Sequence, residues 1–278
     1  MSPKSDIVFK AIFGNAKYVK ILISLLKAVL NLPDEEYEEV SIVDPHLHRD
    51  RRDGKLGIVD VRIKTKSGKI INIEIQLRPK PDFLNRVIFY QSKMIAAQLK
   101  KGENFSAMHK VVSIIIADYD LFPGNEKYHR FFTMCEPGTG QRFADMQEIH
   151  TLELKKLPEE WDGTDLHAWM QFFNAKSKEE LNMIAEAHPT TEIKQAVGRW
   201  AELTQEESAS LIAESEEMYE LDMAGERKAA RAEGREEGIE IGETRALENA
   251  ARKALAKGVP LETVCEFTGL DVETILSL

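Results

Sequence analysis

Residues 57–79 read GIVDVRIKTKSGKIINIEIQLRP, two runs of alternating apolar and polar residues joined by a short polar turn. Side chains on a strand switch faces at every residue, so the pattern predicts a β-hairpin with one apolar face. A three-residue turn with Gly68 in the left-handed conformation would align Asp60 opposite Glu74. We therefore expect Asp60, Glu74 and Gln76 to share the face opposite the apolar one.

The two acidic residues of this hairpin are expected to lie close together. Facing residues of an antiparallel pair have Cβ atoms roughly 4.5 to 5.5 Å apart, so Asp60 and Glu74 would repel each other and one would take up a proton. A shared divalent cation removes the conflict, because carboxylate oxygens are good ligands for such ions. The alternative is an ordinary amphipathic hairpin whose polar face is only solvated.

The order of these residues carries a resemblance. An Asp in one strand, a turn, Glu-x-Gln in the next strand and a helix with Arg and Tyr resemble the PD-(D/E)xK nuclease superfamily. The segments DIVFKAIFGN (6–15), IEIQ (73–76) and FLNRVIFYQSKM (83–94) resemble the recombination-promoting nuclease (Rpn) and putative transposase family. The resemblance implies a restriction-endonuclease-like α/β core, with a mixed sheet flanked by helices, and metal-dependent hydrolysis of DNA as an endonuclease.

The resemblance also implies a metal site. In that family pattern, Asp60 and Glu74 hold the ion together with the backbone carbonyl of Ile75. We expect Mg²⁺, or alternatively Mn²⁺ or Ca²⁺. The ion would lower the pKa of a bound water and stabilise the charge that develops on the phosphate.

Gln76 stands where many superfamily members carry a catalytic Lys. Rpn-type proteins are similar in using Gln, and an amide can orient a water molecule but cannot supply positive charge. The sequence leaves open whether Lys10, Lys64 or Lys93 supplies that charge. Lys10 falls on an opening helix of the kind that flanks the active site in the family, and Asp6 on the same helix would be a helix cap or a further metal contact.

Two groups of basic residues are candidates for substrate binding. Residues 81–101 are expected to form a helix, on which Arg86, Tyr90 and Lys93 lie on one face at spacings of four and three. The packing stripe of this helix is expected to consist of Phe83, Val87, Ile88, Met94, Ile95 and Leu99. A second group lies near the tip of a predicted loop at residues 50–55 and comprises Arg49, Arg51 and Arg52. The helix face would contact a phosphate or orient Glu74, and the basic loop would position a phosphate.

The charge distribution favours a nucleic-acid partner for the first half of the chain. The net charge is −10 overall, but residues 1–135 hold 22 Lys plus Arg against 16 Asp plus Glu, or +6, and the remainder holds 15 against 31, or −16. Within residues 45–101 the count is 14 against 5, or +9. Positive charge therefore gathers around the candidate site, as binding of a phosphate backbone requires.

The remaining patterns extend the α/β prediction. Residues 110–118 form a nearly continuous apolar run, typical of a central strand that is buried on both sides. We expect further strands at 127–134 and 148–154, and helices from residue 166 onward. Trp161, Trp169, Phe172 and Phe173 are expected to anchor the core rather than stack on bases, because this half of the chain is acidic.

The predicted organisation has four parts. A nuclease-like core spans 1–157, a helical extension 158–222, a long Glu/Gly-rich helix 223–257 and a small helical unit 258–278. Gly234, Gly238 and Gly242 weaken the long helix and fall on one face, which favours either a homodimer formed through close helix pairing or a flexible helical spacer. The last unit resembles a degenerate helix-turn-helix but has no Lys or Arg, so we expect a protein contact there.

Few residues point to other classes of protein. Cys135 and Cys265 fit no metal-ligand spacing, and the N-terminus carries no signal-peptide pattern, so we expect a cytoplasmic protein without a membrane segment. His46 and His48 share one side of a predicted strand, but no third ligand favours zinc over a surface role.

Two alternatives to a nuclease remain open at this point. A degenerate nuclease fold could bind nucleic acid or a partner protein through its basic face without cleaving it. The acidic helical half could instead be the main functional part, as an oligomerising scaffold.

Overall fold

The computed structural model describes residues 2–44, 46–47, 57–58, 60–188, 190–203, 235, 242 and 244–277 of the 278-residue chain. These residues divide into two compact units, one within residues 2–203 and one formed by the described residues from 235 onward.

A mixed sheet forms the centre of the first unit. Within the described residues it has six strands in the order β1-β4-β5-β6-β8-β7. The strands are β1 (Ser41–Val43), β4 (Val61–Lys64), β5 (Ile70–Gln76), β6 (Val111–Ala117), β8 (Gln147–Glu153) and β7 (His129–Thr133). The β5–β6 and β6–β8 pairs are parallel and the other pairs are antiparallel. The predicted α/β class with a mixed sheet is confirmed.

The hairpin has the register that its sequence predicts. Val61 of β4 pairs with Ile73 of β5, and the same register continued by one residue sets Asp60 opposite Glu74. Gly68 in the turn has a φ of 91°, as a left-handed residue must. A Cβ at Gly68 would also lie only 2.8 Å from the ring of His109, so two constraints require glycine there.

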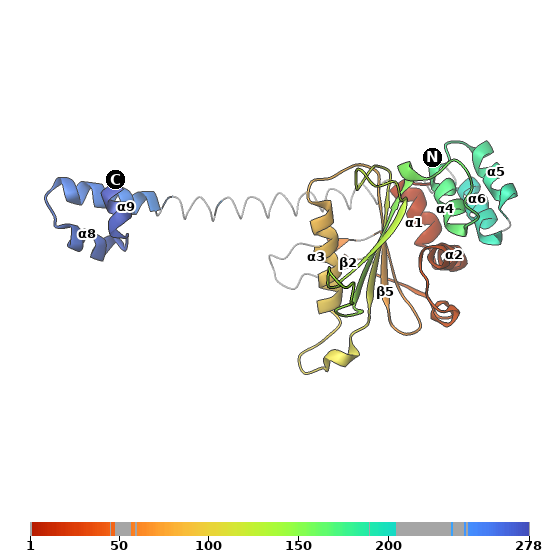
Figure 1. Cartoon of the computed structure of the whole chain (residues 1–278), viewed down its shortest axis with the longest axis horizontal. Coiled ribbons are helices and arrows are strands. Elements are labelled where there is room, and N and C mark those ends of the chain that lie inside the picture. The colour runs from red at the N-terminus through yellow and green to blue at the C-terminus, as the bar shows by residue number, and fades with distance from the viewer. Residues whose placement is uncertain are drawn as a thin grey trace. The chain divides into compact units, whose positions relative to one another are not determined.

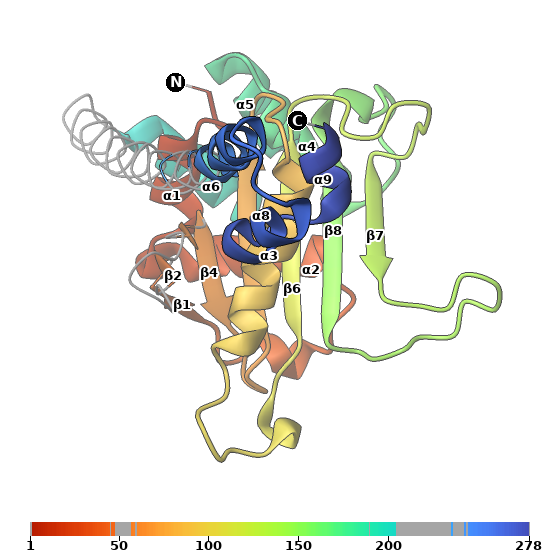
Figure 2. The ribbon, with the colours of Figure 1, turned by 90° about the vertical axis from the view of Figure 1, so that its left-hand side faces the viewer.

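Helices cover both faces of the sheet. Figure 1 shows α3 (Phe83–Ala96) on one side, with α1 (Asp6–Phe13), α2 (Val19–Val29), α4 (Asp165–Asn174), α5 (Lys178–Ala187) and α6 (Thr191–Glu202) on the other. One large hydrophobic core joins the sheet to α1, α2, α4 and α6. In the view onto the sheet, α3 runs across its face (Figure 2). The alternating pattern of β5 therefore does not separate a buried face from a wet one.

Packing under α3 explains why polar residues of β5 are buried. Asn72 is 4% exposed and accepts a hydrogen bond of 2.7 Å from Ser113 Oγ of β6. Phe83 and Val87 of α3 pack in a small cluster with Ile115. The helix ends at Ala96, earlier than predicted.

The expected packing stripe of α3 is correct only in part. Phe83, Val87 and Met94 are buried, but Ile88 is 50% exposed. Apolar residues on a helix face need a neighbouring element to cover them, which the helix sequence does not reveal.

The apolar run at residues 110–118 forms β6, and every residue of this strand is buried. Of the four aromatic residues expected in the core, Trp169, Phe172 and Phe173 are fully buried. Trp169 and Phe172 pack edge-on against Phe13 of α1, and Phe172 also packs edge-on against Trp169 and Phe173. The expectation for Trp161 is wrong, because this residue precedes α4 and is 54% exposed.

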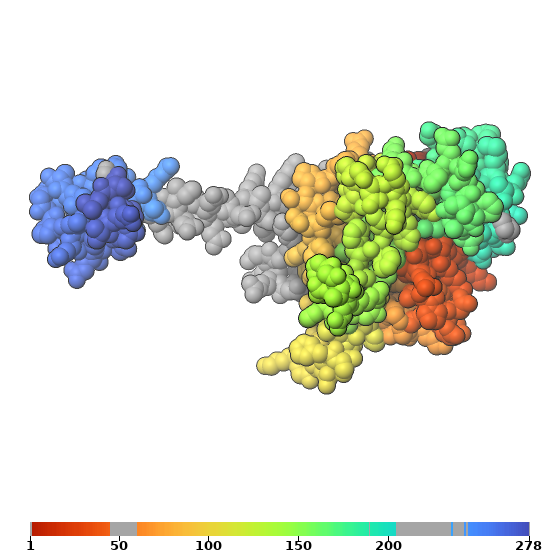
Figure 3. All heavy atoms as spheres, viewed as in Figure 1, coloured from red at the N-terminus to blue at the C-terminus, as the bar shows by residue number. Residues whose placement is uncertain are grey.

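Smaller elements complete the first unit. A separate two-stranded antiparallel sheet joins β2 (His46–Leu47) and β3 (Gly57–Ile58). Short 3-10 turns occur at η1 (Ala16–Tyr18), η2 (Asp34–Tyr37), η3 (Phe105–Ala107) and η4 (Leu154–Lys156). The segment with η3, yellow in Figure 3, projects from the body of this unit.

The second unit is a small helical cluster. Residues 244–256 are helical, followed by α8 (Leu261–Thr268) and α9 (Val272–Ser277). Gly269 ends α8 with a φ of 71°, so the two predicted short helices are confirmed. Ala251, Val264 and Ile275 form the buried centre of this cluster.

Truncation of the two tryptophans should distinguish the core position from the surface position. Trp169→Ala is expected to lower the free energy of unfolding by about 3–5 kcal/mol, because it removes a fully buried ring from the core. Trp161→Ala should cost about 1 kcal/mol or less, since half of its surface is already in water. Urea denaturation followed by circular dichroism measures both, and equal losses would contradict this packing.

Candidate active site

The polar residues of the hairpin lie at one end of the strands, where β4 begins and β5 finishes. Asp60 lies directly before β4, while Glu74 and Gln76 are among the last three residues of β5. The parallel strands β5, β6 and β8 all have their carboxyl ends on this side of the sheet. Ligands of open α/β sheets bind outside the carboxyl ends of the strands, so this side is where a site is expected.

Asp60 is held from two sides. Its Oδ2 accepts a hydrogen bond of 2.8 Å from the backbone N–H of Ile75, and its Oδ1 lies 3.6 Å from Lys10 Nζ. Burial raises the pKa of Asp60, as do the carboxylates of Asp6 and Glu74, although Lys10 and the Ile75 N–H oppose the rise. The ionised form of this side chain is therefore under electrostatic strain in the protein alone.

Helix α1 brings Asp6 and Lys10 to the same place. They are four residues apart, and Lys10 Nζ lies 3.0 Å from Asp6 Oδ2. Burial tends to lower the pKa of Lys10, but Asp60 and Asp6 outweigh it and raise the pKa. Asp6 does not cap α1, because Ser5 occupies the N-cap position and the Asp6 side chain binds Lys10 instead.

Glu74 pairs with the following helix. Arg86 Nη2 of α3 lies 3.3 Å from Glu74 Oε1, and the Arg86 guanidinium lies 5.7 Å from the ring centroid of Tyr90. Glu74 is only 7% exposed. Burial raises its pKa, while the charges of Arg86 and Lys80 act in the opposite direction. The predicted shared face of Arg86 and Tyr90 is thus present and directed at the hairpin.

Of the three lysines left open by the sequence, Lys10 lies against the carboxylates. Lys64 pairs with Ile70 at the far end of the hairpin. Lys93 lies two turns beyond Arg86 on α3, with its Nζ 5.5 Å from the Phe89 ring centroid. Gln76 is buried, and its Nε2 donates a hydrogen bond of 2.8 Å to the carbonyl of Arg78.

A family model described as PD-(D/E)XK nuclease family transposase matches residues 3–230. The chain belongs to this family. No curated protein and no solved structure matches it. Membership supports a nuclease-like or transposase-like function with DNA as substrate, and PD-(D/E)XK nucleases generally use divalent metals. The resemblance seen in the hairpin and in the two flanking helices is confirmed.

Some residues expected at the PD-(D/E)XK site lie outside the described part of the chain. These are Arg49, Arg51 and Arg52 of the basic loop. His48, which is not one of the expected site residues, also lies outside the described part. His46 is described only as part of the backbone of β2. Gly234 and Gly238 also lie outside it, whereas Gly242 is described and is exposed. The roles given to these residues stay predictions.

The residues present fit a divalent cation. Asp6, Asp60 and Glu74 offer the carboxylate oxygens that Mg²⁺ prefers as ligands. Lys10 lies beside Asp6 and Asp60, and Arg86 lies beside Glu74. Asp6 Oδ1 is buried and has no hydrogen-bond partner among the described residues. Within those residues, no group of three or more His, Cys, Asp or Glu is close enough to hold an ion by side chains alone. The backbone carbonyl of Ile75 would therefore have to complete the donor set.

Two further residues act on the site and were missed by the sequence analysis. Lys80 follows β5 and its charge acts on Glu74. Tyr119 follows β6, and its pKa is raised by burial and by the carboxylates of Glu74 and Glu153. Both come directly after the carboxyl ends of parallel strands, which is the signal that would have found them.

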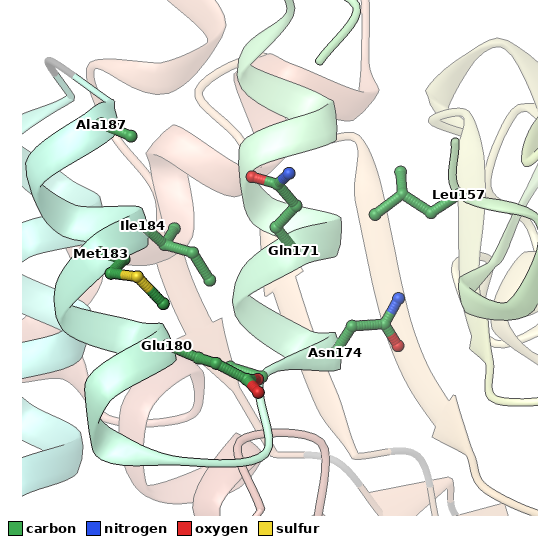
Figure 4. Close-up of a pocket in the computed structure, with 8 residues that line it drawn as sticks. Leu157, Gln171, Asn174, Glu180, Met183, Ile184 and Ala187 are labelled. Carbon is green, nitrogen blue, oxygen red and sulfur yellow. The ribbon is translucent and has the colours of Figure 1, made fainter. Parts of the chain in front are cut away.

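A groove in the helical half of this PD-(D/E)XK protein is not a candidate site. It has a volume of about 350 Å³, and Figure 4 shows Met183 and Ile184 of α5 directed toward α4 across it. Its polar groups already serve the fold, since Gln171 bonds His188 and Asn174 bonds the carbonyl of Leu154. Few polar groups are left there to orient a ligand.

No helix in the described part of the chain is long and apolar enough to cross a membrane.

Neutralising one carboxylate should stabilise the metal-free protein. Asp60→Asn removes a negative charge that is buried beside Asp6 and Glu74, so the free energy of unfolding in EDTA is expected to rise by about 1 kcal/mol. Chemical denaturation in EDTA measures the change. The matched control is Asp34→Asn, whose side chain is 84% exposed and which should change stability by less than about 0.5 kcal/mol. A clear loss of stability in Asp60→Asn would instead mark a structural ion pair.

Proposed function

We propose that this protein is a divalent-metal-dependent DNA endonuclease of the recombination-promoting nuclease and putative transposase type. The observation that carries the proposal is the position of Asp60: its Oδ2 accepts a hydrogen bond from the N–H of Ile75, the residue after Glu74, and Lys10 Nζ lies 3.6 Å from its Oδ1. One carboxylate oxygen of this cluster, Asp6 Oδ1, is buried and has no hydrogen-bond partner in the described part of the chain, which leaves it available to a further ligand.

Asp60, Glu74 and the carbonyl of Ile75 would hold the ion, which we propose is Mg²⁺, with Mn²⁺ or Ca²⁺ as alternatives. The bound cation would polarise the scissile phosphodiester and lower the pKa of a water molecule. The N–H of Ile75 keeps the Asp60 carboxylate oriented, because it donates to Oδ2 and leaves Oδ1 directed toward Lys10.

Lys10 would supply the positive charge that Gln76 lacks. Its ammonium group lies between two carboxylates, which raise its pKa and keep it charged at neutral pH. From α1 it can contact a phosphate oxygen near Asp60, or orient the attacking water. Gln76 is buried at the end of β5 and could orient the water through its carbonyl oxygen, since its Nε2 is used by Arg78.

The substrate would approach along α3. Arg86 holds Glu74 in place and, with Tyr90 and Lys93, presents donors and positive charge to the DNA backbone. The arginines at 49, 51 and 52 would extend this basic surface. Such contacts bind the phosphate backbone without reading its sequence.

The biological setting is part of the same proposal. The transposase description of the family supports a role in DNA recombination at mobile elements. The free thiols of Cys135 and Cys265 suit a reducing cytoplasm. A homodimer formed through Gly234, Gly238 and Gly242 is proposed as well, and light scattering would test it.

Plasmid cleavage tests the proposed activity. The intact protein should nick supercoiled plasmid in Mg²⁺ or Mn²⁺ and not in EDTA. Asp60→Ala and Glu74→Ala should each lower the rate about a hundredfold or more, because a metal ligand contributes several kcal/mol to transition-state stabilisation. Asp34→Ala is the exposed control. If the folded protein binds DNA but does not nick it in the presence of any of these metals, the result would favour the binding module instead.

Replacing Lys10 tests its assigned role. Lys10→Met keeps the length of the side chain but removes the charge beside Asp60, so we expect the nicking rate to fall about a hundredfold. Lys17→Met, on the exposed turn η1, should leave the rate unchanged. Thermal unfolding of both variants checks that they fold. A Lys10→Met rate within about threefold of the parent would transfer the role to another cation.

A further inference from the structure

A second groove is lined by residues that follow the carboxyl ends of β5 and β6. It has a volume of about 300 Å³ and is formed by the start of α3 and by the loop that follows β6. Phe83, Leu84, Tyr119 and Leu121 provide apolar and aromatic walls. Lys80 and Asn85, both exposed, lie at its polar side. This is the combination expected of a small ligand site, namely apolar walls with a few polar groups.

The groove and the carboxylate site share residues. Lys80 and Tyr119 line the groove and also act electrostatically on Glu74. Asn85 of the groove is adjacent in sequence to Arg86, which lies 3.3 Å from Glu74. The groove is therefore close enough to the carboxylate site for one ligand to contact both.

The wall that carries Tyr119 is firmly held. Glu153, fully buried at the end of β8, accepts hydrogen bonds of 2.7 Å from the Leu121 N–H and 3.2 Å from the Phe122 N–H. Lys156 lies 2.8 Å from the same carboxylate and donates to the carbonyl of Phe122. The loop after β6 is thus fixed by a buried acid rather than by its own sequence.

The opposite wall begins at a strained residue. Asp82 precedes α3 with a φ of 57°, and it is the only non-glycine residue with positive φ in the described part of the chain. Such strain persists where the surrounding structure requires it, often at binding sites. Here it starts α3 so that Phe83 packs inward and Leu84 faces the groove.

We propose that this groove binds one nucleobase of the DNA strand next to the phosphate held at Glu74. The proposal rests on the proposed nuclease function. It adds that the nuclease site binds a base of the substrate as well as the phosphate. A flat base suits walls made of Tyr119, Leu84 and Leu121, and stacking of a base on an aromatic ring contributes about 1–3 kcal/mol. The Asn85 amide can both donate to and accept from a base edge. A second phosphate suits the groove less well, because its lining holds one lysine, Lys80, and one acid, Asp82, and the charge of Lys80 already acts on Glu74.

Photocrosslinking tests the proposal without requiring cleavage. Single-stranded oligonucleotides carrying 5-iodouracil at successive positions are bound to the full-length Asp60→Asn protein in EDTA, irradiated and mapped by mass spectrometry. We expect a crosslink at Tyr119. Tyr119→Phe should retain the crosslink, because stacking needs only the ring. Tyr119→Ala should lose it and weaken oligonucleotide binding about fivefold or more in fluorescence anisotropy.

A matched pair on α3 controls for general loss of affinity. Leu84 and Ile88 are 42% and 50% exposed and one helical turn apart, but only Leu84 lines the groove. Leu84→Ala should lower both crosslink yield and affinity, whereas Ile88→Ala should change neither. Equal effects of the two variants, or crosslinks that map elsewhere in bound protein, would overturn the proposal.

The two proposals fail separately. Metal-dependent nicking that needs Asp60, together with no crosslink at Tyr119, would reject the base site and leave the nuclease. A crosslink at Tyr119 in a protein that does not nick DNA would support the base site and reject the nuclease.

Discussion

The pairing of β4 with β5 is the constraint on which the rest of the candidate site depends. The turn at Gly68 fixes the register, and the register sets Asp60 opposite Glu74. A slip of one residue would move every side chain of the strand to the other face. Both faces are covered by helices, so such a slip would also bury charged residues in the main hydrophobic core. The same pairing that completes the core thus aligns the two carboxylates.

Cations on neighbouring helices reduce the repulsion between the two aligned carboxylates. Buried like charges are unfavourable, and Lys10 of α1 and Arg86 of α3 each approach one of the two carboxylates. The two helices lie on opposite faces of the sheet (Figure 1), so each carboxylate is approached by a cation from a different side. The compensation is incomplete, because Asp6 adds a third carboxylate with an unpartnered oxygen among the described residues. Functional sites commonly retain such unfavourable arrangements at the expense of stability.

Local sequence patterns predicted the parts of the site that strand and helix periodicity control. The hairpin register, the buried strand β6 and the common face of Arg86 and Tyr90 all follow from residue spacing. The approach of Lys10 to Asp60 does not, because the two are fifty residues apart in sequence and their contact depends on how α1 packs at the sheet edge. The same holds for Tyr119, which lies near Glu74 because β5 and β6 are parallel neighbours.

Errors in the sequence analysis have a similar origin. Trp161 was expected in the core by its residue type, but it precedes α4 and lies at the surface. Ile88 was expected to pack, yet nothing among the described residues covers that side of α3 enough to bury it. Asp6 has the residue type of a helix cap, but Ser5 holds the N-cap position and the Asp6 side chain accepts a hydrogen bond from Lys10. In each case the outcome depends on a neighbour that local sequence does not specify.

The most direct test of the central claim is to locate a metal ion in crystals of the protein grown with Mn²⁺. Anomalous scattering identifies Mn²⁺ independently of any activity. The account predicts one strong peak within bonding distance of Asp60 and Glu74, and no peak there in Asp60→Asn crystals. A peak at other residues, or none at the hairpin in well-ordered crystals at millimolar Mn²⁺, would contradict the assignment of this carboxylate pair as a metal site.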